Sequence, residues 1–87
     1  MKIVIRDSKG KYNTITISDT EKVSDLKKKI ETEYKTSNNI ELIFNGMILE
    51  DNYTLRELDI EDGNAIDYLG VFLAGINKYI IIIVFNI

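Results

Sequence analysis

Apolar and polar residues alternate at the start of the chain. Residues 1–6 and 14–17 both alternate, and the second run is β-branched throughout, which is typical of half-buried strands. Residues 7–10 between them are rich in turn formers, including Gly10, which adopts a positive φ easily. The two runs therefore predict a β-hairpin.

The spacing changes to a helical one at Val23. Apolar residues then recur at i, i+3, i+7 and i+11, which predicts an amphipathic helix over residues 23–34. Ser18 and Thr20 are alternative N-caps, and Ser18 has capping-box spacing with Glu21. Residues 36–39 favour local hydrogen bonds and end the helix.

A second set of strands follows the helix. Residues 40–44 predict a strand, Asn45-Gly46 is a strong hairpin signal, and residues 47–49 predict a short return strand. Thr54 is a candidate cap for a helical turn at residues 55–58, before a turn at 61–64 and a last strand at 65–69.

This order of elements predicts an α+β roll in which one helix packs across a mixed sheet of four to five strands. A single apolar layer should separate the helix from the sheet. We expect it to contain Ile3, Ile5, Ile15, Ile17, Val23, Leu26, Ile30, Leu42, Leu49, Leu55 and Ile60.

Composition limits the possible chemistry. The chain has 87 residues, enough for one domain with a modest core. It contains no cysteine and no histidine, which excludes disulfides, thiol chemistry and the usual zinc ligands. Its carboxylate clusters at 50–51 and 59–62 are typical of turns, and no phosphate-binding string occurs. We therefore expect no enzyme activity, no cofactor and no metal.

Charge and the N-terminal sequence give two further expectations. The net charge is −3 and the basic residues are scattered, which argues against nucleic acid as a partner. No apolar signal-peptide core follows Met1, so we expect a cytoplasmic or nuclear location.

Residues 42–66 have apolar, glycine and acidic positions at fixed intervals, in the sequence LIFNGMILEDNYTLRELDIEDGNAI. This string resembles the second half of the ubiquitin-like family, the β-grasp fold. The Gly10-Lys11 turn and the helix sequence around Leu26 and Ile30 extend the resemblance to about residues 1–75. It implies a recognition module whose sheet face binds protein receptors.

The resemblance also implies contact residues. The central isoleucine of the family's apolar patch corresponds to Ile43, which we expect to be exposed or half-exposed because it faces away from Leu42 and Phe44. Asp67 would place a carboxylate beside the patch, so we expect a partner with a basic surface. The candidate partner-binding residues are Ile43, Leu69, Ser8, Asp67 and Gly46.

Conjugation is a second theme of the family. Lys11, Lys27 and Lys29 lie at positions of family lysines that accept modification, although residues 27–29 also suit a solvated helix face. Modifiers of this family end in Gly-Gly, whereas this chain continues past Gly75 without that pair. We therefore expect the chain as written not to be competent for conjugation, and the alternative is a precursor processed after Gly75.

The C-terminal segment departs from the family pattern. We expect a ubiquitin-like domain at residues 1–75 and an apolar tail at 76–87, where residues 79–87 are almost all β-branched or aromatic. Nine residues of helix span about 14 Å, short of the roughly 30 Å hydrocarbon core. An added strand within the chain or between chains is therefore favoured over a membrane contact. A domain that self-associates or contacts a membrane through this tail is the third functional alternative.

Overall fold

A five-stranded mixed sheet and one helix make up the structure. The computed structural model describes residues 1–7, 9–34 and 40–70. The sheet order is β2-β1-β5-β3-β4, with β1 and β5 parallel and the other neighbours antiparallel. The elements are β1 (Lys2–Arg6), β2 (Tyr12–Thr16), α1 (Val23–Tyr34), β3 (Ile40–Phe44), β4 (Met47–Ile48) and β5 (Ala65–Gly70).

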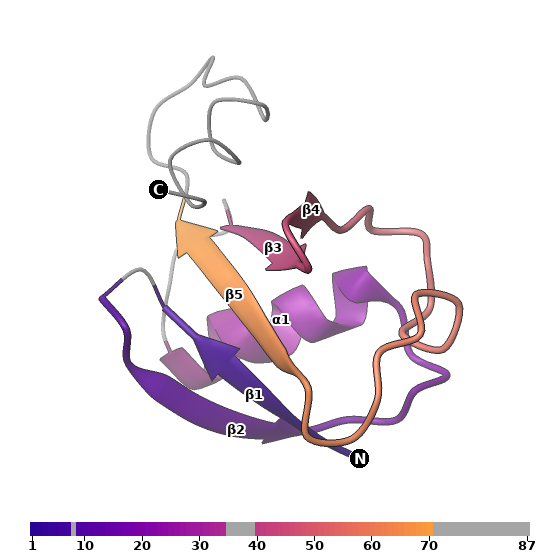
Figure 1. The fold of residues 1–87 in the computed structure, drawn as a ribbon, viewed down its shortest axis with the longest axis horizontal. Coiled ribbons are helices and arrows are strands. Elements are labelled where there is room, and N and C mark those ends of the chain that lie inside the picture. The colour runs from indigo at the N-terminus through magenta and orange to yellow at the C-terminus, as the bar shows by residue number, and fades with distance from the viewer. Residues whose placement is uncertain (8, 35–39, 71–87) are drawn as a thin grey trace.

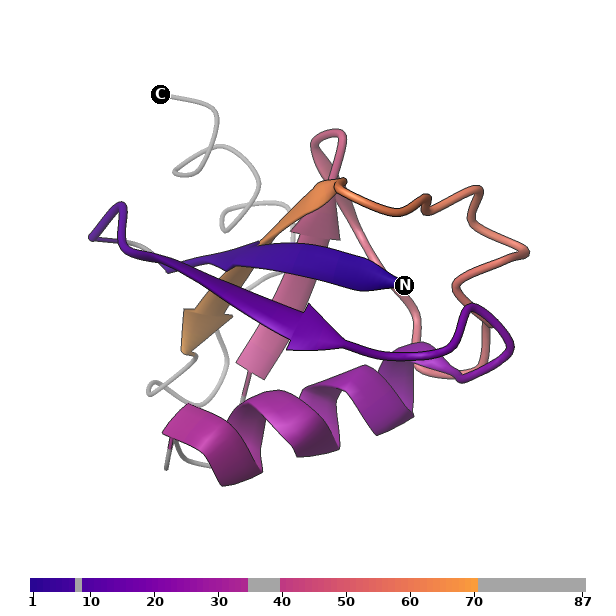
Figure 2. The same cartoon turned by 90° about the horizontal axis from the view of Figure 1, so that it is seen from below.

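The helix lies along one face of the sheet. In Figure 1 β5 passes in front of α1, and Figure 2 shows α1 lying beneath the strands. This arrangement confirms the predicted α+β fold with one helix across a mixed sheet.

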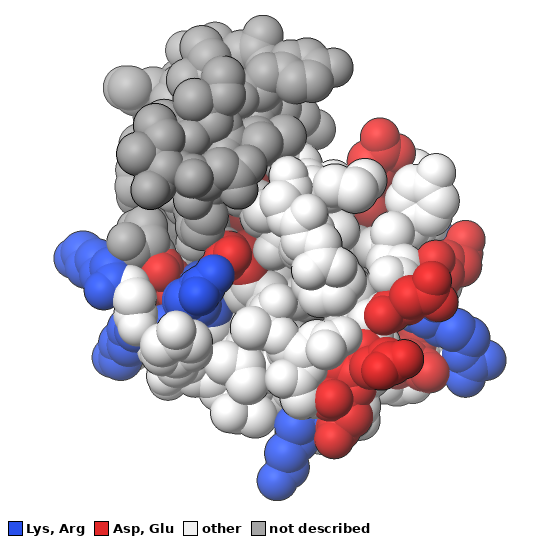
Figure 3. All heavy atoms as spheres, in the orientation of Figure 1, with Lys and Arg blue, Asp and Glu red and all other residues white. Residues whose placement is uncertain are grey.

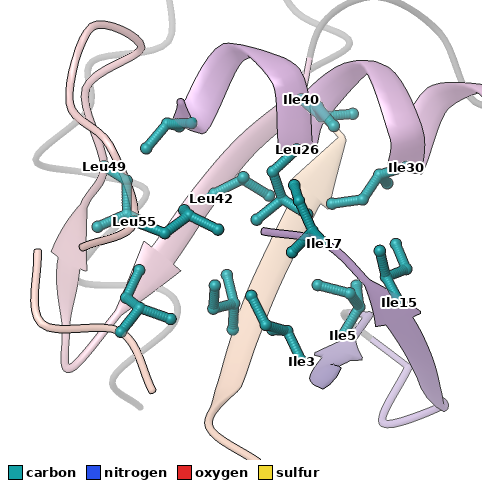
Figure 4. Packing of buried hydrophobic residues seen from close by; sticks show 13 residues of the cluster. Ile3, Ile5, Ile15, Ile17, Leu26, Ile30, Ile40, Leu42, Leu49 and Leu55 are labelled. Carbon is teal, nitrogen blue, oxygen red and sulfur yellow. The ribbon is translucent and has the colours of Figure 1, made fainter. Parts of the chain in front are cut away.

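One hydrophobic cluster fills the space between α1 and the sheet (Figure 4). Every residue of the predicted apolar layer belongs to it, and Ile40 and Ile66 join them. The helix contributes Val23, Leu26 and Ile30, each fully buried. Burying a side chain of this size contributes about 1.5–3 kcal/mol, so this layer holds the helix against the sheet.

Both predicted hairpins form with the expected turn residues. The carboxylate of Asp7 accepts hydrogen bonds from the backbone N–H groups of Lys9 and Lys11, both at 2.9 Å, and Gly10 has φ +83°. In the second hairpin Asn45 and Gly46 both have positive φ, 53° and 77°. Two consecutive positive φ angles define the turn that suits the twist of a two-residue hairpin.

The predicted cap of α1 is wrong. The Ser18 hydroxyl lies 2.9 Å from that of Thr20 instead of reaching the first turn of the helix, which begins at Val23. The N–H of Lys22 donates to the carboxylate of Asp25 at 3.0 Å, so a side chain within the helix closes its start.

A distant loop satisfies the next two donors of the helix. The N–H of Val23 donates to the Tyr53 carbonyl at 2.9 Å, and that of Ser24 donates to the Asp51 carbonyl at 3.2 Å. The first N–H groups of any helix need such partners. Here the partners lie far away in sequence, which is why local cap signals misplaced the start.

The turn after β4 forms as predicted around Thr54. Its hydroxyl accepts from the Glu57 N–H, and the Glu57 carboxylate accepts from the Thr54 N–H, both at 3.1 Å. This reciprocal pair is a capping box. The turn ends at Asp59, which has φ 56°, and the Ile60 N–H donates back to the Leu55 carbonyl at 3.0 Å.

Candidate protein-binding face

The strand register aligns one side chain from each of the five strands on the face of the sheet opposite α1, which we call the outer face. Their neighbours along the strands, such as Ile5, Leu42 and Ile66, belong to the core cluster, and strand alternation puts the intervening residues on the other side. We call this set the outer row, and it runs Tyr12, Arg6, Asp67, Ile43, Ile48 from β2 to β4.

The polar half of the outer row is an ion pair beside an aromatic ring. Arg6 donates through Nε and Nη2 to the two carboxylate oxygens of Asp67, the second bond at 2.9 Å. The guanidinium carbon of Arg6 also lies 6.0 Å from the centroid of the Tyr12 ring. The hydrogen bonds to Asp67, and then Tyr12, raise the pKa of Arg6 above its already high ordinary value, so the guanidinium stays charged.

This pairing removes the reason given for a basic partner. That expectation assumed that Asp67 would be an uncompensated carboxylate beside the apolar patch. The side chain of Asp67 is only 16% exposed, and Arg6 already supplies the cation. A basic partner surface stays a prediction.

The apolar half of the outer row corrects the expectation for Ile43. Ile43 is 2% exposed, so it is neither exposed nor half-exposed, although it is not a member of the core cluster. The prediction that it faces away from Leu42 holds, since Leu42 lies in that cluster. Alternation along a strand reveals the face on which a side chain lies, but not whether that face is covered.

The remaining contact candidates spread around Ile43. Leu69 is half-buried on β5, two residues beyond Asp67, and it pairs in register with Glu41. Gly46 lies in the turn between β3 and β4, where its φ of 77° makes it a turn residue. Ser8 lies outside the described residues. Figure 3 looks onto the outer face and shows uncharged side chains in its middle, adjoining basic and acidic side chains on the left and acidic ones on the right.

The sequence matches the Rad60-SLD family model, described as ubiquitin-2 like Rad60 SUMO-like, over residues 1–69. The chain belongs to this family. The match begins at Met1, directly before β1, and ends within β5, so it includes both hairpins and α1. It shows that the chain is a ubiquitin-like module. No curated protein matches the chain.

In this SUMO-like domain, sequence reasoning did not identify two polar members of the outer row, Arg6 and Tyr12. The alternation of β1 and β2 suggests that Arg6 and Tyr12 share a face, but their pairing follows only from the hairpin register. The contact between Arg6 and Asp67 needs the parallel pairing of β1 with β5, across a separation of 61 residues. No local signal reveals such a pair.

The lysines of the SUMO-like domain have different surroundings. Lys11 is exposed, and Lys29 is exposed with its Nζ donating to the Thr16 carbonyl at 3.2 Å. Lys27 is only 15% exposed, and its Nζ lies 2.6 Å from Asp51, so a solvated position is wrong for this residue. Modification of these lysines stays a prediction.

Several expectations fall on residues beyond β5. Gly75 and the tail at 76–87 lie outside the described residues, so processing after Gly75 and the domain boundary stay predictions. Within residues 1–7, 9–34 and 40–70, no group of three His, Cys, Asp or Glu side chains is placed to hold a metal ion. In this same part of the chain, no helix is long and apolar enough to cross a membrane.

Proposed function

We propose that this SUMO-like domain is a non-catalytic protein-binding module that engages its partner through the outer face next to Ile43. Leu69 and Ile48 supply the contact surface, because both are half-buried and apolar. Ile43 lies between their strands and supports them from a position that is itself 2% exposed. The proposed site keeps the expected face and Leu69, adds Ile48, and gives Ile43 a supporting role in place of a contact.

The observation that carries this proposal is the bidentate pair of Arg6 and Asp67. Desolvating a lone carboxylate at the edge of an interface would cost a partner several kcal/mol. Because Asp67 is neutralised within the domain, a partner can cover the adjacent apolar residues without leaving a charge unpaired. Protein interfaces combine apolar contacts with paired polar groups, and the outer row offers an apolar half beside a paired polar half.

The proposal predicts an apolar partner surface, and a charge placed at Leu69 should disrupt the contact. The wild-type domain, Leu69→Lys and the control Thr32→Lys are each immobilised, and the proteins that they retain from a cell extract are compared. The affinity of each of the three domains for the purified partner is then measured. Thr32 is exposed on α1, away from the outer face, so the control introduces the same charge elsewhere. We expect Leu69→Lys to weaken binding about tenfold or more, because central contact residues contribute about 1–2 kcal/mol or more.

Equal binding by wild type and Leu69→Lys would contradict the proposal. Loss of binding by both Leu69→Lys and Thr32→Lys would also contradict it, because the contact would then not be specific to the outer face. The amide spectrum of each variant establishes that it is folded before binding is compared.

A further inference from the structure

We propose that Asn45 is a site of spontaneous covalent modification, at which its carboxamide is converted into a carboxylate and the turn between β3 and β4 is disrupted. The turn consists of Asn45 and Gly46, and β4 beyond it is an edge strand of the sheet (Figure 1). The effect on partner binding rests on the proposed function, whereas the reaction itself is tested without any partner.

The reaction is an attack on the side chain of an asparagine by the backbone nitrogen of the next residue. The Gly46 nitrogen loses its proton to a base in the solvent and bonds to Cγ of Asn45. The bond between Cγ and Nδ2 then breaks, and this nitrogen takes up a proton and leaves as ammonia. Water opens the resulting cyclic imide at either of its carbonyl carbons, which yields aspartate or isoaspartate. The net change consumes water and releases ammonia.

The first support is that both reacting groups are accessible. Asn45 is exposed, and the glycine after it has no Cβ to shield its backbone nitrogen. The hydrogen bonds among the described residues involve neither the carboxamide of Asn45 nor the N–H of Gly46. Neither group therefore has to give up such a bond before the two can meet.

The second support comes from Asp62-Gly63, the other place in the sequence where glycine follows an asparagine or an aspartate. Aspartate forms the same imide, but both reacting groups are held here. The Asp62 carboxylate accepts from the N–H of Lys2 at 2.6 Å, and the Gly63 N–H donates to the Lys2 carbonyl at 2.7 Å. The fold thus protects one of the two susceptible pairs and leaves the other open.

The third support is the weak attachment of β4, because the turn must leave its folded geometry for the attack on Cγ. The two residues of β4 pair with β3 as Met47 with Phe44 and Ile48 with Ile43. Met47 is 67% exposed, so little apolar burial resists opening. Short elements with few buried contacts open at low cost in free energy. The turn can therefore reach the reactive geometry without unfolding of the domain.

Conversion changes the turn in two ways. Aspartate adds a negative charge beside the outer face. Isoaspartate carries the backbone through Cγ, which inserts an extra atom into a turn whose two positive φ angles fit the twist of the hairpin. Because turn geometry fixes the register of a hairpin, Ile48 should lose its pairing with Ile43. Ile48 belongs to the proposed contact surface, so partner binding should weaken as the protein ages.

The experiment incubates the full chain at neutral pH, both folded and in guanidinium chloride. Peptide mass spectrometry that separates aspartate from isoaspartate follows each site with time. In the folded chain we expect Asn45 to be converted faster than Asn13, Asn52 and Asn64. Folding should slow the reaction of Asp62 about tenfold more than that of Asn45, because two hydrogen bonds hold Asp62-Gly63.

Asn45→Gly is the matched control. Gly-Gly suits the same two-residue turn, so this variant keeps the hairpin but has no carboxamide at the position. Folded wild type should release ammonia faster than the folded variant. The amide spectrum of the purified isoaspartate form should differ from that of fresh protein at residues 43–48 and match it at Lys28 and Thr32 on α1. Aged wild type should also bind the partner more weakly than Asn45→Gly aged in parallel.

Equal release of ammonia by wild type and Asn45→Gly overturns the proposal, as does equal protection of Asn45 and Asp62 by folding. An isoaspartate form with unchanged amides at Ile43 and Ile48 also overturns it, because β4 then keeps its register. None of these three measurements uses a partner, so a failure here is distinct from a failure of the proposed function. Equal partner binding by the two aged proteins, with Leu69→Lys still impaired, overturns the effect on recognition.

Discussion

The same strands place different kinds of side chain on the two faces of the sheet. The inner face is mostly apolar and packs against α1, and its buried hydrophobic residues belong to one cluster. The outer face carries the outer row, in which a ring, an ion pair and two isoleucines follow one another across five strands. Alternate residues of the same strands thus serve stability on the inner face and, in the proposed function, recognition on the outer face.

The sharpest test compares Leu42 with Ile43, which are adjacent on β3 but lie on opposite faces. Leu42→Ala should lower the free energy of unfolding by about 2–5 kcal/mol, because it leaves a cavity in the core cluster. Ile43→Ala should cost less than Leu42→Ala, because the outer face can relax around the missing atoms. Denaturant unfolding of both variants measures this difference, and equal losses would break the comparison between the faces.

The ion pair of the outer row should contribute much less. A double-mutant cycle of Arg6→Gln and Asp67→Asn should give a coupling of about 0.5–1 kcal/mol, a small value because the side chain of Arg6 is 41% exposed and solvent screens it. The coupling should fall in concentrated salt, where charges are screened within about 3 Å. A coupling that does not respond to salt would mean that packing, and not charge, joins the two residues.

The smallest effect at neutral pH is expected at the rim of the inner face, where the rings of Tyr34 and Tyr68 stack at 5.7 Å. Burial, more than the nearby charge of Glu33, raises the pKa of Tyr34 above its ordinary value of 10.0. The folded state therefore holds the phenol proton to higher pH than the unfolded state. The resulting stability is complete below about pH 10 and is lost as the pH rises through the folded pKa.

Tyr34→Phe tests this dependence. At pH 7 the substitution should change the free energy of unfolding by less than about 1 kcal/mol, because among the described residues the Tyr34 hydroxyl has no hydrogen-bond partner. Above pH 10 the variant should lose less stability than the wild type. If the free energy of unfolding falls equally with pH in the two proteins above about pH 10, Tyr34 is not the source of the pH dependence.

Sequence reasoning worked well for the inner face and less well for the outer one. Residues such as Ile3, Ile5 and Leu26 were placed in the core because period and burial coincide in a two-layer fold. For Ile43, alternation along the strand predicted the correct face of the sheet, but the predicted exposure of the side chain was wrong. Arg6 and Asp67 meet only through parallel pairing of the first and last strands, which no local pattern encodes.

The start of α1 shows the same limit on a smaller scale. Ser18 and Thr20 have the side chains that cap helices, yet they bond to each other. The carbonyl groups of Asp51 and Tyr53 take the role instead. Capping propensity describes the hydrogen bonds that a residue can make locally. Here a loop distant in sequence accepts the hydrogen bonds of the first helical N–H groups instead.

This long-range cap has a consequence for the order of folding. The first turn of α1 is complete only when the loop around Asp51 and Tyr53 has returned to it from beyond β4. Contacts of high sequence separation form late because chain closure must precede them. The helix should therefore grow from its apolar middle toward Val23, and its first turn should become protected from hydrogen exchange together with the 51–53 loop and not with the rest of the helix.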